Sequence, residues 1–281
     1  MKQSLDKGTV LGLLLAVGGI CGGLLLEGGK LREIAQPTAA MIVLGGTIGA
    51  TMVGQPFRVF LSACKQLAAV VFQVQTDPQG AMKQIIDFAN KARKNGIVSL
   101  EKEAMAAPDP FLRKALTLAV DGTEPQEIRR MMELEIALED NRRSAEAKVL
   151  EAAGGYSPTI GIIGAVLGLI QVMKHLENIE EVGRGIAVAF VATIYGVALA
   201  NVLLLPAAAK MKAKAHAQMR IAELTLEGVI GIAEGLNPKL ILGKLEAYLD
   251  EKPSEAPKGA PARGAAPAAA PAPAPEAAVK A

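Results

Sequence analysis

Two uncharged segments of this sequence hold the side chains that could take part in ion transfer, Ala152–Met173 and Gly185–Ala209. About 20 residues at 1.5 Å rise cross a bilayer core of roughly 30 Å as a helix. Their polar side chains offer only hydroxyls and amides, among them those of Ser157, Thr159, Gln171, Thr193, Tyr195 and Asn201. Neither segment contains Asp, Glu, Lys, Arg or His. If the pair lines an ion pathway, the charged group must come from another chain.

Two more uncharged runs precede this pair. The hydrophobic content of 51% with only 3% aromatic residues is gathered in blocks, which argues against an ordinary globular domain. Helices are predicted at about 8–26, 34–57, 152–173 and 185–209. A signal peptide is the alternative for the first run, but the sequence lacks a convincing A-x-A cleavage site and a second apolar run follows closely. We expect residues 1–57 to form a tight antiparallel hairpin and 152–209 to form a second, pore-lining hairpin.

The rest of the chain is polar or of low complexity. Residues 58–151 carry 14 Lys+Arg and 14 Asp+Glu, and helix start and stop signals predict a compact helical domain. In it the second helix continues to about Val74, and a later helix runs to Ala153. The domain has no histidine and no nucleophile–base pair, so we do not expect an enzyme. Further helices are predicted over 210–250, and the Ala/Pro-rich residues 251–281 are expected to be a disordered tail. The fold class is therefore an all-α polytopic membrane protein.

The charge distribution predicts the orientation of the chain. Four crossings put both termini and the 58–151 insertion on one side. Lys2, Lys7, Arg58 and the lysines at 210–214 lie near membrane ends on that side, which the positive-inside rule makes cytoplasmic. The net charge of +2 is too small to suggest nucleic acid. We expect no cofactor and no metal site, because Cys21 and Cys64 stand alone.

Several stretches resemble the MotA/PomA family of flagellar stator subunits. They read "YSPTIGIIGAVLGLI", "GIAVAFVATIYGVALANVLLLP", "NKARKNGIVSLEKE" and "GIAEGLNPKLILGKLEAYL". The first two also look like the ExbB/TolQ relatives, which energise outer-membrane processes, but four helices with this insertion fit the MotA pattern better. The resemblance implies a bacterial inner-membrane stator subunit. It also implies a ring of five chains around a MotB-like partner whose single transmembrane helix carries an aspartate, and contact with the rotor protein FliG.

The resemblance also assigns residues. Pro158 matches the family's third-helix proline; it either begins that helix or frees backbone carbonyls at the pore. Pro206 matches the fourth-helix proline, where a kink and a helix end are both open. Thr193 matches a threonine that faces the partner's aspartate, although its hydroxyl could instead bond to its own helix.

The insertion carries the residues implied for the rotor contact. Arg93 and Glu101 match the family's charged pair that engages FliG, and Lys94 adds a second positive charge. Without the resemblance, these charges would be read as part of an ordinary solvated helix face.

Ala165 points to the transported ion. In sodium-coupled relatives this position, seven residues past Pro158, is a threonine. Sodium must replace its water shell with oxygen ligands, and an alanine side chain offers none. The resemblance therefore predicts H+ as the coupling ion rather than Na+.

Overall fold

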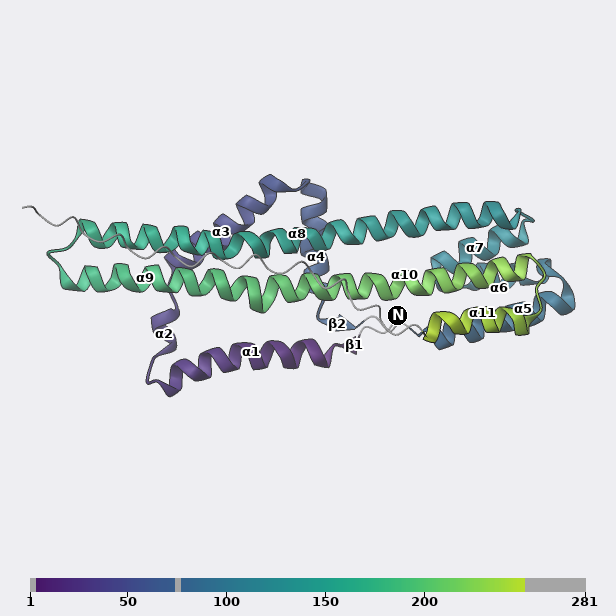
Figure 1. Ribbon diagram of the computed structural model, residues 1–281, viewed down its shortest axis with the longest axis horizontal. Coiled ribbons are helices and arrows are strands. Elements are labelled where there is room, and N and C mark those ends of the chain that lie inside the picture. The colour runs from purple at the N-terminus through teal and green to yellow at the C-terminus, as the bar shows by residue number, and fades with distance from the viewer. Residues whose placement is uncertain (1–3, 74–76, 251–281) are drawn as a thin grey trace, which may run out of the picture.

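The computed structural model describes residues 4–73 and 77–250, which are almost entirely helical (Figure 1). Four helices in this part are long and apolar enough to cross a membrane, which confirms the predicted all-α membrane fold. The predicted tail, 251–281, lies outside the described residues. The helices are α1 (Lys7–Leu26), α2 (Leu31–Ile34), α3 (Pro37–Gly54), α4 (Phe57–Ala69), α5 (Pro78–Asn95), the 3-10 turn Ile97–Leu100, α6 (Glu101–Ala106), α7 (Pro110–Val120), α8 (Pro125–Lys174), α9 (Ile179–Ala198), the π-helical turn Leu199–Leu204, α10 (Leu205–Ala233) and α11 (Pro238–Asp250).

A long antiparallel pair forms the axis of the molecule (Figure 1). One member is α8, whose 50 residues run without a break. The other is α9, the π-helical turn and α10 in series, spanning Ile179–Ala233. The expected boundary near residue 152 is therefore wrong, because Gly154 and Gly155 stay helical. Gly154 packs against Leu205 so closely that a side chain there would meet Leu205 Cδ2 at 2.6 Å, so tertiary packing holds this glycine in the helix.

The turn between α8 and α9 is shorter than expected. The fourth helix begins at Ile179 rather than near Gly185, because the Asn178 side chain accepts hydrogen bonds from the backbone N–H groups of Glu180 and Glu181. Such an N-cap satisfies donors that a helix start leaves free. Glu180 and Glu181 also place negative charge at the positive end of the helix dipole.

The first two spans do not form the expected tight hairpin. α3 packs against α8 and α9, whereas α1 lies across α9–α10 from α3 (Figure 1). The connection between Leu26 and Pro37 carries the short helix α2, which makes it long enough to cross the α9 surface. α1 thus stands apart from its expected partner.

The second helix also ends earlier than expected. α3 stops at Gly54, and α4 begins at Phe57 in a different direction (Figure 1). Pro56 causes the break, because its ring excludes the α conformation for the preceding residue. Gln55 accordingly has φ −136° and ψ 145°.

The polar regions form one core rather than two domains. Helices α5, α7 and the start of α8 bury Ile85, Leu116 and Ile128 against Leu224 and Ile230 of α10 and Ile241 of α11. The predicted units 58–151 and 210–250 are thus packed together at the end of the molecule remote from the α8–α9 turn (Figure 1).

Candidate functional site

Backbone-to-backbone packing joins α8 and α9 within the membrane. Gly161, Gly164 and Gly168 of α8 are buried against Ala189, Ala192 and Gly196 of α9. A Cβ atom on Gly161 would lie 2.9 Å from the Ala192 carbonyl oxygen, and one on Gly196 would lie 2.6 Å from that of Ser157. Small residues at membrane interfaces allow such close approach. Because these faces are in contact, an ion pathway must run along the surface of the α8–α9 pair rather than between its helices.

Two hydroxyl groups fix the position of α9. Ser157 is fully buried, and its Oγ donates to the Gly196 carbonyl at 2.9 Å. The Tyr195 hydroxyl donates to the Ile34 carbonyl at 2.5 Å and accepts from the Gln36 N–H at 3.4 Å. These bonds tie the hairpin to itself and to the start of α3. They satisfy polar groups that would be costly to leave free inside a bilayer.

Three of the predicted pathway residues lie at neighbouring levels. Thr193 is beside Gly161, since a Cβ atom on Gly161 would be 3.4 Å from the Thr193 Cα. Pro158 and Ala165 lie three and four residues from Gly161, about one helical turn to either side. All three are half-buried. The structure therefore brings Pro158, Ala165 and Thr193 together on the hairpin.

Pro158 lies inside α8 rather than at a helix start. Proline has no N–H, so the Gly154 carbonyl has no donor at its usual position. The Thr193 hydroxyl donates to the Ala189 carbonyl of its own helix at 3.2 Å, which leaves its oxygen lone pairs as acceptors. Among Pro158, Ala165 and Thr193, only Thr193 thus brings a side-chain oxygen, and none brings a charge.

Pro206 lies apart from the other three. It is thirteen residues beyond Thr193, about 20 Å along the helix. It neither ends the helix nor stands alone as a kink, because the π-helical turn Leu199–Leu204 precedes it and α10 continues to Ala233. A wider turn before a proline relieves the clash of its ring with the preceding turn.

The three charged residues of the insertion are exposed around one junction. Arg93 and Lys94 occupy the last turn of α5, and Glu101 begins α6. Gly96, with φ 82°, reverses the chain between them. An ion pair between Lys91 and Glu103 braces α5 against α6, and the Lys91 hydrogen bond lowers the pKa of Glu103. This junction lies near the end of the molecule opposite the α8–α9 turn (Figure 1).

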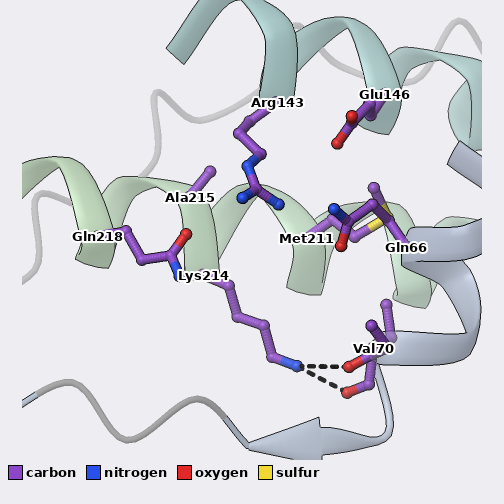
Figure 2. A pocket seen from close by; sticks show the side chains of 9 residues that line it. Gln66, Val70, Arg143, Glu146, Met211, Lys214, Ala215 and Gln218 are labelled. Atoms are coloured by element: carbon purple, nitrogen blue, oxygen red, sulfur yellow. Dashed lines mark hydrogen bonds between the residues drawn. The ribbon is translucent and has the colours of Figure 1, made fainter. Parts of the chain in front are cut away.

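A buried carboxylate that the sequence did not single out lies below the membrane pair. Glu146 is 1% exposed, accepts from Ser62 Oγ at 2.5 Å, and has no hydrogen-bond partner for Oε2 among the described residues. It lines a cavity of about 60 Å³ together with Arg143 and Lys214 (Figure 2). A buried apolar cluster lies between this cavity and the site near Thr193, formed by Val70, Leu150, Ala153, Leu204, Ala207 and Ala208. Glu146 is therefore separated from the pathway residues. The one sequence signal for a buried Glu146 is its place on the same face of α8 as apolar residues that are buried.

Comparison with known proteins identifies the family. Residues 10–96 match the family model "Motility protein A N-terminal", and residues 103–223 match the "MotA/TolQ/ExbB proton channel family". Motility protein A of Bacillus subtilis is 34% identical over 88% of this chain and 92% of its own length. The C. jejuni MotAB structure matches with a TM-score of 0.84 at 31% identity, covering 89% of this chain and 98% of that one. The flagellar MotAB stator complex of Bacillus subtilis matches with a TM-score of 0.80 at 34% identity, covering 87% and 96%. The chain therefore belongs to the motility protein A branch of the MotA/TolQ/ExbB proton channel family.

Proposed function

We propose that this chain is a stator subunit of the flagellar motor. With a MotB-like partner it carries protons across the bacterial inner membrane and converts their flow into torque on the rotor. The observation that carries the proposal is the close packing of α8 on α9 where their apolar segments, 152–173 and 185–209, contain no Asp, Glu, Lys, Arg or His, so that a second chain must supply the charged group. Relatives named for motility, aligned over most of the chain, favour this function over that of an ExbB/TolQ-like energiser.

In this proposal the partner's transmembrane aspartate approaches the level of Pro158, Ala165 and Thr193. A charged carboxylate at the bilayer centre costs about 2.5–3.5 kcal/mol on insertion scales, so it tends to take up a proton there. Each elementary charge that crosses supplies about 2.3 kcal/mol per 100 mV. A ring of five copies around the partner would present this site repeatedly, so that protonation and release drive its rotation.

The transported ion is proposed to be H+. Ala165 contributes no oxygen, so Thr193 is the one residue of the three with a side-chain oxygen for a cation. The site therefore offers few ligands with which to replace the water shell of Na+. A proton needs only the partner's carboxylate and a water path.

The orientation follows from the charges. Lys7, Arg58 and Lys210 lie next to membrane spans, and all belong on the cytoplasmic side with both termini. The exposed junction of Arg93, Lys94 and Glu101 then faces the cytoplasm at a distance from the membrane, where FliG could reach it. Complementary surface charges there would set register and encounter rate.

Deletion of the gene, followed by counting of flagella and measurement of swimming, tests the function. Immotile cells with intact filaments are expected in a strain that lacks a second stator, and normal swimming would contradict the proposal. In complemented cells, speed should be insensitive to external sodium and fall when a protonophore collapses the proton gradient. A steep rise with sodium at fixed pH would reject H+ as the ion.

Thr193→Ala tests the pathway more locally. It should reduce swimming speed, because it removes the hydroxyl lone pairs near the partner's carboxylate. Thr159→Ala is the matched control: Thr159 is exposed on α8 and bonds only to the Tyr156 carbonyl of its own helix at 2.7 Å. Equal swimming of both variants at wild-type speed would remove Thr193 from the pathway.

A further inference from the structure

A crevice lies between α1 and the elements beside it, which α1 contacts at the π-helical turn and through Lys210. None of the 20 residues of α1 is buried. Gly12 faces the crevice, yet a Cβ atom there would meet nothing within 4 Å. The crevice has a volume of about 440 Å³, within the range of small-ligand pockets. Its other wall is formed by the end of α4, the π-helical turn and the start of α10, including Leu67, Leu203 and Pro206.

The depth of the crevice matches one leaflet of a bilayer. Along α1 it extends from Gly8 to Ala16, eight residues or about 12 Å. On the opposite wall it extends from Lys210 to Asn201, nine residues or about 14 Å. Half of a hydrocarbon core is about 15 Å. The crevice thus starts at the charged edge of the membrane spans and ends near the level of the bilayer midplane.

The two ends of the crevice differ in polarity. At the charged end Lys210 Nζ contacts Asp6 Oδ2 and donates to Thr9 Oγ1. Lys7 adjoins Asp6 at the start of α1, so lysines outnumber carboxylates by one at this end. Lys214, one turn beyond Lys210, is held by the carbonyl oxygens of Ala69, Val70 and Phe72 and lines the other cavity. The remaining lining is apolar except for Asn201, whose Nδ2 is bonded to the Val197 carbonyl at 2.9 Å.

The contacts at the charged end also limit what can fill the crevice. Lys210 joins the start of α1 to α10, so the crevice is closed at this end by the Lys210 side chain. A transmembrane helix of a neighbouring chain, about 10 Å wide with its side chains, would have to continue past this bridge. A single acyl chain is narrow enough for a crevice that is closed at the Lys210 end. An anionic phosphate attached to it would lie beside the positive charge there.

We propose that this crevice binds a phospholipid of the leaflet at the Lys210 end, with an acyl chain between α1 and α10 and its phosphate beside Lys210. The lipid would add to the few contacts that α1 makes with the π-helical turn. It would also touch the π-helical turn beside Pro206. The proposal requires α1 to span the membrane but not stator activity, and its test does not use motility.

The test uses the full chain co-expressed with its partner, purified and placed in nanodiscs of phosphatidylethanolamine with or without phosphatidylglycerol. Retained lipid is counted by native mass spectrometry. Ala16→Phe, which fills the crevice, should lose most of the lipid retained by wild type. Leu14→Phe is the matched control, because Leu14 is 66% exposed and lies on the opposite side of α1. Circular dichroism and assembly size should be unchanged in both, and Gly12→Leu replaces Ala16→Phe if that variant does not fold.

The headgroup is tested separately. Lys210→Gln should weaken the preference for phosphatidylglycerol about fivefold, the factor expected for about 1 kcal/mol per basic residue near an anionic surface. Wild-type lipid retention in Ala16→Phe, or equal loss in Leu14→Phe, would overturn the proposal. So would a covalent dimer formed by a benzophenone label attached to Gly12→Cys, with Cys21 and Cys64 replaced by serine, because a neighbouring chain would then occupy the crevice.

Discussion

Gly196→Ala tests the close contact between α8 and α9. The new Cβ atom would lie 2.6 Å from the Ser157 carbonyl oxygen and 3.0 Å from the Gly161 Cα. Ordinary contact begins near 3.4 Å, so the helices would have to separate by about 0.8 Å. Overpacking of this kind costs about 1–3 kcal/mol. The same shift would stretch the 2.9 Å bond from Ser157 Oγ to the Gly196 carbonyl beyond hydrogen-bonding range.

Two further terms partly cancel. Loss of an interhelical hydrogen bond in a membrane costs about 0.6–2 kcal/mol, and alanine gains up to about 1 kcal/mol of helix propensity over glycine. The net destabilisation is then about 1–4 kcal/mol. At roughly 2–4 °C per kcal/mol for a protein of this size, the melting temperature should fall by about 2–16 °C.

The assay is thermal unfolding of the purified protein, followed by circular dichroism because the chain has no tryptophan. Gly183→Ala is the matched control on the same helix, since a Cβ atom there meets nothing within 4 Å. It should leave the melting temperature unchanged or slightly raised. If Gly196→Ala melts at or above Gly183→Ala, the two helices are not in backbone contact and the reasoning fails.

Three further predictions concern the cytoplasmic side. Arg93→Glu and Glu101→Lys should each impair swimming while membrane insertion, checked by fractionation, is retained; normal swimming of both would move the rotor contact elsewhere. The Lys210 hydrogen bond lowers the pKa of Asp6 from 3.8 to about 2, so its stabilisation is complete above pH 3.8 and is lost as the pH falls towards 2. Asp6→Asn should reduce the pH dependence of the melting temperature between pH 3.8 and about pH 2. An unchanged pH dependence would exclude Asp6 as its source. Lys214→Met removes a charged donor from three carbonyls at the end of α4 and beyond it, and should cost about 1–3 kcal/mol. Lys212→Met, which breaks only a surface pair with Glu151, should cost at most about 1 kcal/mol, and equal melting of the two lysine variants would contradict this ranking.

The membrane spans could be predicted because their signal is local. An uncharged run long enough to cross a bilayer leaves few alternatives for its backbone. The helix boundaries were harder to predict from the sequence. Gly154 remains helical through its packing on Leu205, and local helix propensity contains no information on that contact. The break at Pro56 has a local cause, because a proline disfavours the helical conformation of the residue before it, and was predictable from the sequence.

The candidate site could be predicted only in part, because it also depends on tertiary contacts. Thr193 and Pro158 could be placed by resemblance, but the choice between a helix start and a helix interior for Pro158 depended on the neighbouring glycines. The burial of Glu146 requires α4 to turn back onto α8, which puts Ser62 beside it. The separation of α1 from α3 depends on how the Leu26–Pro37 connection crosses α9, and hydropathy contains no information on that path.

The unbroken length of α8 has a mechanical consequence. Its 50 residues make a rod of about 75 Å, and the 33 residues between Pro125 and Pro158 make an arm of about 50 Å. A swing of about 10° at Pro158 would displace Pro125 by roughly 9 Å. Because α10 runs alongside this arm, the pair resists bending better than either helix alone. A small tilt beside the ion site would thus reach the cytoplasmic end as a displacement comparable to the width of a helix.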